Sequence, residues 1–251
     1  MNPYEAPRAP SADEWRQAFV PLGVTRGEVW APLGAGVLLV DSPVVWLVTA
    51  RSVLEGAGAS PVVAWVAATT ETGDGHALID LSTGRAADLA WLRHPERDLA
   101  ACVFPIGSTW RIKAFNEART LQETDLQPLL PACVVGNPYG IGAPGQRPTA
   151  LALDGTLAGV DVSARTIITT APLLPRNAGA PLLVPLPPQA GGGVSLAGIA
   201  THSVAVSEGV QSTLSPVRLT IAAPIALAFE LIRSPAGKAA RKAALAAGKP
   251  T

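Results

Sequence analysis

The sequence has few of the residues that cross-link small folds or bind metal ions. Its 251 residues include two cysteines, three histidines and one methionine. Cys102 and Cys133 lie in separate apolar runs, with no CxxC pair or His/Cys cluster beside them. Such cysteines pack as small hydrophobic residues, and no metal-ligand spacing or phosphate-binding glycine loop occurs. The sequence therefore predicts buried free thiols, no metal site and no cofactor.

Charged residues make up only 15% of the chain, and long apolar runs are missing. Lysine plus arginine and aspartate plus glutamate both number 19, so the zero net charge provides no overall attraction to nucleic acids or membranes. No stretch approaches the roughly 18 apolar residues of a membrane-spanning helix. The first residues lack the basic region and apolar core of a secretory signal. We therefore expect a cytoplasmic protein that recognises its partners locally, with no membrane and no nucleic acid among them.

Hydrophobic residues, at 48%, are sufficient for a core, and 24 glycines with 24 prolines divide the chain into short segments. This composition favours short strands joined by turns. Strand-like runs occur before and after a more polar connection at 109–127. They are 28–30, 36–40, 44–48, 61–68, 75–81, 87–92 and 99–104 in the first part, and 131–135, 149–160, 164–170, 181–184, 195–206 and 215–219 in the second. The pattern predicts an all-β chain, with a closed antiparallel barrel in the first part.

The two ends of the chain differ from this pattern. Residues 1–26 are predicted to be an N-terminal arm rich in proline and alanine, in which 13–20 have the spacing of a short amphipathic helix. Residues 221–233 are the one strongly helical stretch. Residues 234–251 carry basic but no acidic side chains, so we predict a disordered, solubilising tail. The alternative for this tail is contact with an anionic partner, the weak exception to the absence of nucleic acid.

Four local motifs are more specific than the overall pattern. In chain order they are LVTARSVL (47–54), RDLAACV (97–103), CVVGNPYGIG (133–142) and PRNAGAPLL (175–183). Their order, spacing and local context resemble those of the trypsin-like serine peptidases, especially the bacterial ones. The first, second and fourth resemble the segments that carry the catalytic histidine, aspartate and serine, and the third resembles a turn of the second barrel.

The resemblance covers about residues 27–233 and implies the chymotrypsin fold. In that fold two six-stranded antiparallel β-barrels, here expected at 27–118 and 119–220, are followed by a C-terminal helix, here expected at 221–233. Cys102 and Cys133 would then lie in different barrels, so a disulfide between them is not expected.

The chain departs from the family at two of the three catalytic positions. The resemblance places Ser52 at the position of the histidine, Asp98 at that of the aspartate and Ala178 at that of the nucleophilic serine. A serine hydroxyl does not act as a base near pH 7, and a methyl group cannot attack a carbonyl. We therefore predict that the triad is vestigial and that the chain is a pseudoenzyme.

The loop around Ala178 differs from the family pattern as well. Asn177 and Gly179 match it, but Arg176 replaces the glycine whose N–H would help to form the oxyanion hole. A side chain narrows the backbone conformations available at that position. We expect the former oxyanion loop to be rearranged or collapsed.

Asp98 needs a new partner if no histidine stands beside it. A buried carboxylate without hydrogen bonds costs stability. We predict that the Ser52 hydroxyl donates a hydrogen bond to Asp98, with Arg51 as a second candidate donor. Asp98 would then survive as a structural acceptor.

A strand near the expected specificity pocket offers a further site. The resemblance suggests that Gly198, Ala200, His202 and Val204 form an edge to which an extended peptide adds as a strand. The histidines at 94 and 202 are expected to lie on the surface or in a pocket wall rather than to act as a relocated base.

These features favour a non-catalytic trypsin-like protease homologue that serves as a protein-binding or scaffolding module. Two alternatives remain at this stage: an active serine-peptidase-type hydrolase with a rearranged site, and an inactivated form of a live trypsin-like peptidase. The expected partner is a protein or a peptide.

Overall fold

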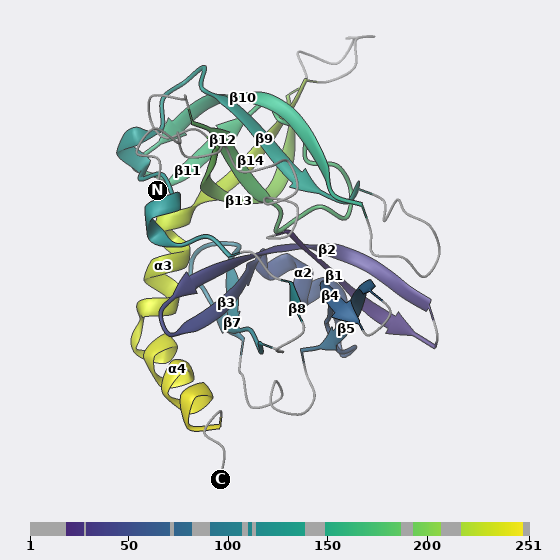
Figure 1. The fold of residues 1–251 in the computed structure, drawn as a ribbon. Coiled ribbons are helices and arrows are strands. Elements are labelled where there is room, and N and C mark those ends of the chain that lie inside the picture. The colour runs from purple at the N-terminus through teal and green to yellow at the C-terminus, as the bar shows by residue number, and fades with distance from the viewer. Residues whose placement is uncertain are drawn as a thin grey trace, which may run out of the picture.

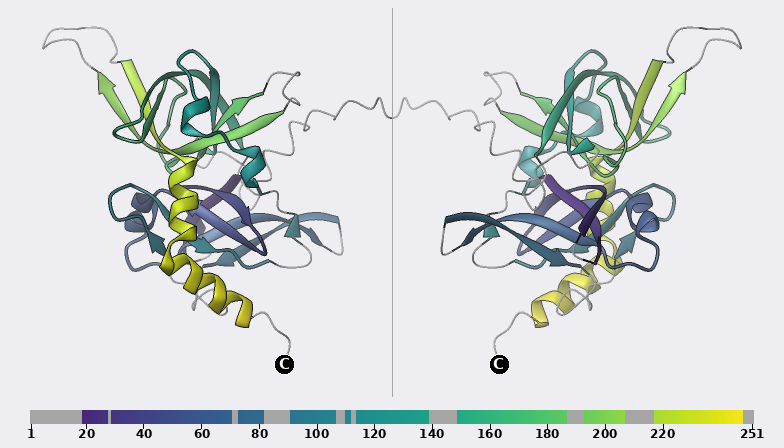
Figure 2. Two further views of the ribbon diagram at one scale, coloured as in Figure 1. Left: turned by 90° about the vertical axis from the view of Figure 1, so that its left-hand side faces the viewer. Right: turned by 90° about the vertical axis from the view of Figure 1, so that its right-hand side faces the viewer.

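The computed structural model describes residues 19–27, 29–70, 73–81, 91–106, 110–111, 114–138, 149–186, 193–206 and 217–247. Its strands form two antiparallel sheets, one from each half of the chain, and two helices from the C-terminal part lie alongside (Figure 1). Figure 2 shows the sheet of the second half above that of the first, with α3 passing from one to the other. The predicted all-β architecture with a C-terminal helix is confirmed.

The first half forms an eight-stranded sheet in the order β5-β4-β1-β2-β3-β7-β6, with β8 paired to β4. Within the described residues the end strands β5 and β6 do not pair, whereas a closed six-stranded barrel was expected; residues 82–90, which include most of the predicted strand 87–92, lie outside the described part. The strands are β1 (Phe19–Arg26), β2 (Val29–Asp41), β3 (Val44–Thr49), β4 (Val63–Thr70), β5 (Gly73–Asp80), β6 (Leu92–Arg93), β7 (Ala100–Val103) and β8 (Trp110–Arg111).

The second half closes into the predicted six-stranded antiparallel barrel, in the order β10-β11-β14-β13-β12-β9. Its strands have the β-branched and apolar residues that a closed barrel buries. They are β9 (Pro131–Gly136), β10 (Leu151–Asp161), β11 (Thr166–Thr169), β12 (Pro181–Pro185), β13 (Val194–Val206) and β14 (Val217–Pro224). Residues 187–192, between β12 and β13, lie outside the described part of the chain.

The connection between the halves is bonded to both of them. Phe115 forms a bridge with Leu39 of β2, and the Leu121 N–H donates to the Leu196 carbonyl of β13 over 3.0 Å. Two short 3-10 helices, η2 (Glu117–Arg119) and η3 (Glu123–Asp125), complete this connection. One hydrophobic cluster runs through both sheets and α3, with Trp46, Leu182 and Phe229 among its buried members. The two halves therefore share a core.

The predicted N-terminal arm is too long at its C-terminal end. Residues 19–26 form strand β1, because Phe19, Val20, Leu22 and Val24 are buried and the strand pairs with β2 along its whole length. The short helix expected at 13–20 is wrong at its last two residues, which begin β1. Residues 1–18 lie outside the described part of the chain.

The predicted C-terminal boundaries also need correction. Residues 221–224 complete β14, and helix α3 (Ile225–Arg233) begins only after Pro224. Residues 235–247, expected to be disordered, form helix α4 (Pro235–Ala247), since the segment is rich in alanine and packs Ala240 and Ala244 against the core. Residues 248–251 lie outside the described part.

Arginines hold the helices against the rest of the molecule. Arg233 of α3 pairs with Asp41 of β2 at 3.2 Å and with Glu117 of η2 at 2.7 Å, and Arg241 of α4 also pairs with Asp41. Arg165, in the β10–β11 turn, pairs with Glu123 at 2.8 Å and with Glu230 of α3 at 2.7 Å. No helix in the described ranges has both the length and the apolar character needed to cross a membrane.

Replacing Arg165 tests this ion-pair network. Residue 165 has a left-handed backbone conformation, with a φ of 46°. Arg165→Met keeps a side chain at this position but removes both ion pairs, so we expect the free energy of unfolding to fall by about 1 kcal/mol. Arg165 lowers the pKa of Glu230 through their hydrogen bonds, so this stabilisation is complete above the carboxyl's ordinary pKa of about 4.3 and is lost as the pH falls through the lowered value. Denaturant unfolding at pH 7 and pH 3 measures both effects. Arg119→Met, at an exposed arginine, is the control and should change little.

Candidate functional site

The turn that carries Ala178 lies directly against strand β2. The Ala35 N–H donates to the Ala178 carbonyl over 2.8 Å. A Cβ atom at Gly34 would stand 2.7 Å from the same carbonyl oxygen and 2.5 Å from a methyl group of Val53. The turn of the second half and the start of helix α2 (Arg51–Ala57) are therefore packed together at this glycine.

Gly179 allows the second close approach of the turn. Its φ of 85° suits glycine, and a side chain there would collide with the Ala35 carbonyl and the Thr49 hydroxyl. The same Cβ position lies 3.0 Å from the nitrogen of Ala50, which precedes α2. Ala178 and Ser52, the second residue of α2, thus lie on neighbouring segments across the junction of the two halves.

Ser52 and Asp98 form a closed hydrogen-bonded pair. The Ser52 N–H donates to Asp98 Oδ1 over 2.7 Å, and the Ser52 hydroxyl donates to Asp98 Oδ2 over 2.8 Å. The predicted hydrogen bond from Ser52 is confirmed. Arg51, the second donor considered for Asp98, does not bond to it. Arg51 pairs with Glu55 at 3.2 Å and donates to the His94 carbonyl over 3.4 Å.

Asp98 also takes the place of a helix cap. The residue before α2 is Ala50, which has no side-chain group to accept a hydrogen bond from the first turn. N–H groups in the first turn of a helix have no partner within the helix. Asp98 accepts one of them, that of Ser52, from a different part of the chain. The aspartate therefore has a structural function that does not need a histidine.

Arg176 stands in an unfavourable backbone conformation. Its φ is 63°, in the left-handed region, where a side chain costs about 1–2 kcal/mol. The side chain is exposed, and within the described residues it makes no hydrogen bond or ion pair. The former oxyanion loop thus contains a strained arginine whose guanidinium is free.

Asn177 is fully buried beside Gly136. A side chain at Gly136 would overlap the amide of Asn177, so the glycine provides the space for it. Neither amide atom of Asn177 has a hydrogen-bond partner within the part of the chain described. A buried amide without partners costs free energy. The loop is therefore held in place by packing rather than by hydrogen bonds of this side chain.

In the part of the chain that the structure describes, the three histidines have other contacts than Ser52 and Asp98. His94 Nδ1 accepts the N–H groups of Glu96 and Arg97 over 3.2 and 3.1 Å, and partial burial lowers the pKa of His94, which favours this neutral acceptor form. The ring of His76 packs on Trp65, and His202 Nδ1 lies 3.0 Å from the Thr201 hydroxyl. Among the described hydrogen bonds none joins an imidazole to Ser52 or Asp98.

The predicted peptide-binding edge is wrong at two of its four residues. Gly198 pairs with Leu182 on one side and Pro224 on the other, and Ala200 is bonded to the Ala178 turn and to β14, so neither lies at an edge. His202 and Val204 lie beyond the end of β12 and pair only with β14 among the described strands. The open edge therefore begins after Ala200.

Sequence reasoning missed the residues of β2 that receive the turn. Gly34 and Gly36 flank Ala35 in an otherwise apolar strand, and a Cβ at either position would meet neighbouring atoms within 3 Å. Glycine inside a strand marks a close backbone approach. The two glycines in the sequence therefore indicate that another segment lies close to this strand, but they do not identify that segment.

No known family profile matches the chain, and no curated protein matches it. Solved structures do match. They include the HtrA-type protease AlgW with a decapeptide, at a TM-score of 0.54, and its AlgWS227A form with a tripeptide, at 0.53. Both are 18% identical to this chain and match 87% of it, and the chain spans 64% and 60% of their lengths.

At this level of identity the likeness concerns the fold alone. The closed six-stranded barrel, the second antiparallel sheet and the C-terminal helix agree with it. The chain therefore has a trypsin-like fold.

Removing the Asp98 carboxylate should destabilise the protein. Asp98→Ala deletes the acceptor of both Ser52 hydrogen bonds, so we expect the free energy of unfolding to fall by about 1–2 kcal/mol. Asp98→Asn, which still offers one oxygen to the Ser52 N–H, should lose less. Urea unfolding measures the difference, and an unchanged midpoint for Asp98→Ala would contradict the structural role.

Relieving the backbone of Arg176 should stabilise the protein. Arg176→Gly removes the Cβ that the left-handed conformation disfavours, and we expect a gain of about 0.5–1 kcal/mol after the entropy of glycine is counted. Arg176→Ala keeps a Cβ and is the matched control, with no gain expected. Thermal unfolding of the three proteins makes the comparison.

Proposed function

We propose that this protein is a non-catalytic homologue of the trypsin-like serine proteases that binds a protein or peptide partner. The closed Ser52–Asp98 pair carries this proposal. The Ser52 hydroxyl, at the proposed former histidine position, donates a hydrogen bond to the Asp98 carboxylate, and across the junction Ala178 provides only a methyl group. No group in this arrangement accepts a proton from a nucleophile or attacks a carbonyl.

The former oxyanion loop supports binding of a hydrogen-bond acceptor. Within the described residues, the backbone N–H groups of Arg176 and Ala178 donate no hydrogen bond. The exposed guanidinium of Arg176 adds a positive charge beside them. A carbonyl or carboxylate of a partner, held there without being cleaved, would satisfy these donors.

The end of β13 supports an extended partner. His202 and Val204 are exposed and lie on the part of the strand that has no neighbour opposite β14 in the described structure. A peptide that adds to such an edge gains main-chain hydrogen bonds and needs no catalytic group. The loop and this edge together would hold a peptide in the junction of the two halves.

The alternative of a rearranged active site receives no support from the described geometry. It requires an accessible hydroxyl or thiol next to a base. The Ser52 hydroxyl is committed to Asp98, and the Thr201 hydroxyl beside His202 is buried and donates to the Ile221 carbonyl over 3.1 Å. Burial raises the pKa of the Cys102 thiol and raises that of Cys133 to about 11, so neither is an activated nucleophile at neutral pH. The unpaired state of both thiols is compatible with the reducing cytoplasm in which we place the protein.

A probe that reacts covalently with nucleophilic serines tests the proposal. We expect no labelling of the wild-type protein by a fluorophosphonate, measured by intact mass, under conditions that label an active trypsin-like protease fully. Stoichiometric labelling of the wild type at one serine would overturn the non-catalytic assignment.

The matched positive control restores the missing groups. In Ser52→His combined with Ala178→Ser and Arg176→Gly, an imidazole at position 52 can donate to Asp98 as the serine does now, and position 178 regains a hydroxyl. We expect slow labelling of this triple variant at position 178. The double variant that keeps Ser52 should remain unlabelled, because its hydroxyl has no base.

A further inference from the structure

Strand β6 lies at the end of the first sheet, and one of its backbone edges has no neighbouring strand within the described residues. In the described part of the chain it pairs only with β7, Leu92 with Ala101 and Arg93 with Ala100, and the His94 N–H donates to the Leu99 carbonyl over 2.9 Å. Hydrogen-bonded residues alternate along an antiparallel pair. Since His94 bonds to the β7 side, the N–H and C=O of Arg93 point away from β7.

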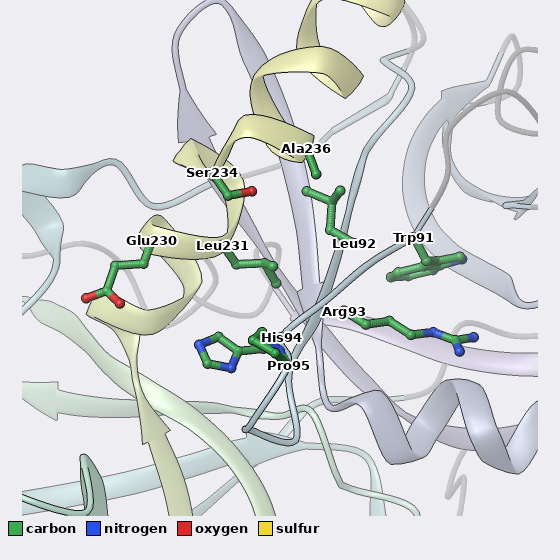
Figure 3. A pocket seen from close by; sticks show the side chains of 9 residues that line it. All are labelled: Trp91, Leu92, Arg93, His94, Pro95, Glu230, Leu231, Ser234 and Ala236. Atoms are coloured by element: carbon green, nitrogen blue, oxygen red, sulfur yellow. The ribbon is translucent and has the colours of Figure 1, made fainter.

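Side chains along this segment alternate between two sides. Figure 3 shows Trp91 and Arg93 pointing to one side, and Leu92 and His94 pointing to the other, toward α3. This is the alternation expected of an extended strand. A segment laid along the open edge would also place successive side chains on opposite sides.

The side of Leu92 and His94 has a hollow of about 390 Å³ between β6 and the junction of α3 and α4 (Figure 3). Leu92, Leu231, Pro95 and Ala236 provide apolar lining. Apart from Arg93 at its border, polar groups of the lining have partners: the Glu230 carboxylate accepts from Arg165 over 2.7 and 2.8 Å, His94 Nδ1 accepts two backbone N–H groups, and the Ser234 hydroxyl oxygen accepts the Gly237 N–H over 3.2 Å. This hollow therefore fits an apolar side chain.

The side of Trp91 and Arg93 has a hollow of about 210 Å³ between β6 and the C-terminal end of α2. Leu54, Ala57 and Pro61 line it, and Trp91 and Arg93 border both hollows. The Arg93 side chain is exposed, and no hydrogen bond or ion pair of it occurs among the described residues. A free guanidinium over an apolar floor fits a carboxylate side chain.

We propose that β6 and its two hollows are a docking site for an extended segment of another protein, which adds to the sheet beside β6. The segment carries an apolar residue for the hollow at Leu231 and, next to it in sequence, an acidic residue for Arg93. The outward N–H and C=O of Arg93 bond to its backbone. Only a polypeptide supplies all three groups in this alternating geometry.

This site is separate from the junction of the two halves and goes beyond the proposed function. It uses the face between α2, β6 and the α3–α4 junction, and none of its lining residues belongs to the Arg176–Gly179 loop. It does not require the protein to be inactive. The two proposals can therefore be tested independently of each other.

Synthetic peptides test the proposed sequence preference. The probe is a fluorescent octapeptide of threonines with a central Leu-Asp pair, compared by anisotropy with the same peptide carrying Leu-Lys. We expect the Leu-Asp peptide to bind the wild type about fivefold more tightly, and Arg93→Glu to reverse that order. No binding of the Leu-Asp peptide at about 1 mM, or an unchanged order with Arg93→Glu, contradicts the proposal.

A second pair of variants tests the hollow at α3. Ala236 is exposed at the start of α4, so Ala236→Arg should fill the hollow without unfolding the protein and should weaken binding at least about fivefold. Ala239→Arg, on an exposed part of the same helix, is the control and should bind as the wild type does. Equal binding by both variants rules the hollow out.

Arg176→Gly distinguishes this site from the junction of the two halves. We expect it to leave Leu-Asp peptide binding unchanged, because Arg176 lies in the other site. If it abolishes binding while Ala236→Arg does not, the peptide occupies the junction and the β6 site is wrong. Fluorophosphonate labelling of the wild type would overturn the non-catalytic assignment and leave the β6 result standing.

Discussion

The two halves of the molecule are held in register by a backbone contact that tolerates almost no side chain. The Ala178 carbonyl accepts the Ala35 N–H, and Gly34 and Gly179 leave room for the two segments to touch. Small residues allow such an approach, and the buried N–H and carbonyl satisfy each other. This contact places the Ala178 turn beside the start of α2, where Ser52 is bonded to Asp98. The junction of the two halves is thus built from backbone contacts rather than from the side chains at positions 52 and 178.

Asp98 has a structural role in the described geometry. A carboxylate at this position would orient a histidine in an active enzyme. Here it caps α2 through the Ser52 N–H and receives the Ser52 hydroxyl as well. Its retention therefore follows from the stability of α2. Arg176 differs, since its left-handed backbone costs stability and its exposed side chain makes no hydrogen bond or ion pair among the described residues to offset that cost.

The sequence predicted best those features that depend on short segments. The strands, the second barrel and the Ser52–Asp98 bond follow from local patterns and from the order of the motifs. The helix at 235–247 was missed because its composition alone favours a solvated tail, whereas its docking depends on Ala240, Ala244 and the pairing of Arg241 with Asp41. Gly198 and Ala200 were taken for an edge because a strand's neighbours cannot be read from the strand itself. The two hollows beside β6 are lined by segments far apart in the sequence, so no local pattern predicts them.

Asp41 links the beginning of the chain to its end. It pairs with Arg233, which lies 192 residues later, and with Arg241 of the last described helix. The first sheet is therefore synthesised long before the helices that cover it. During translation its α3-facing surface stays without its native cover until α3 and α4 have been made, so the first sheet acquires its complete packing only after the second barrel has been synthesised.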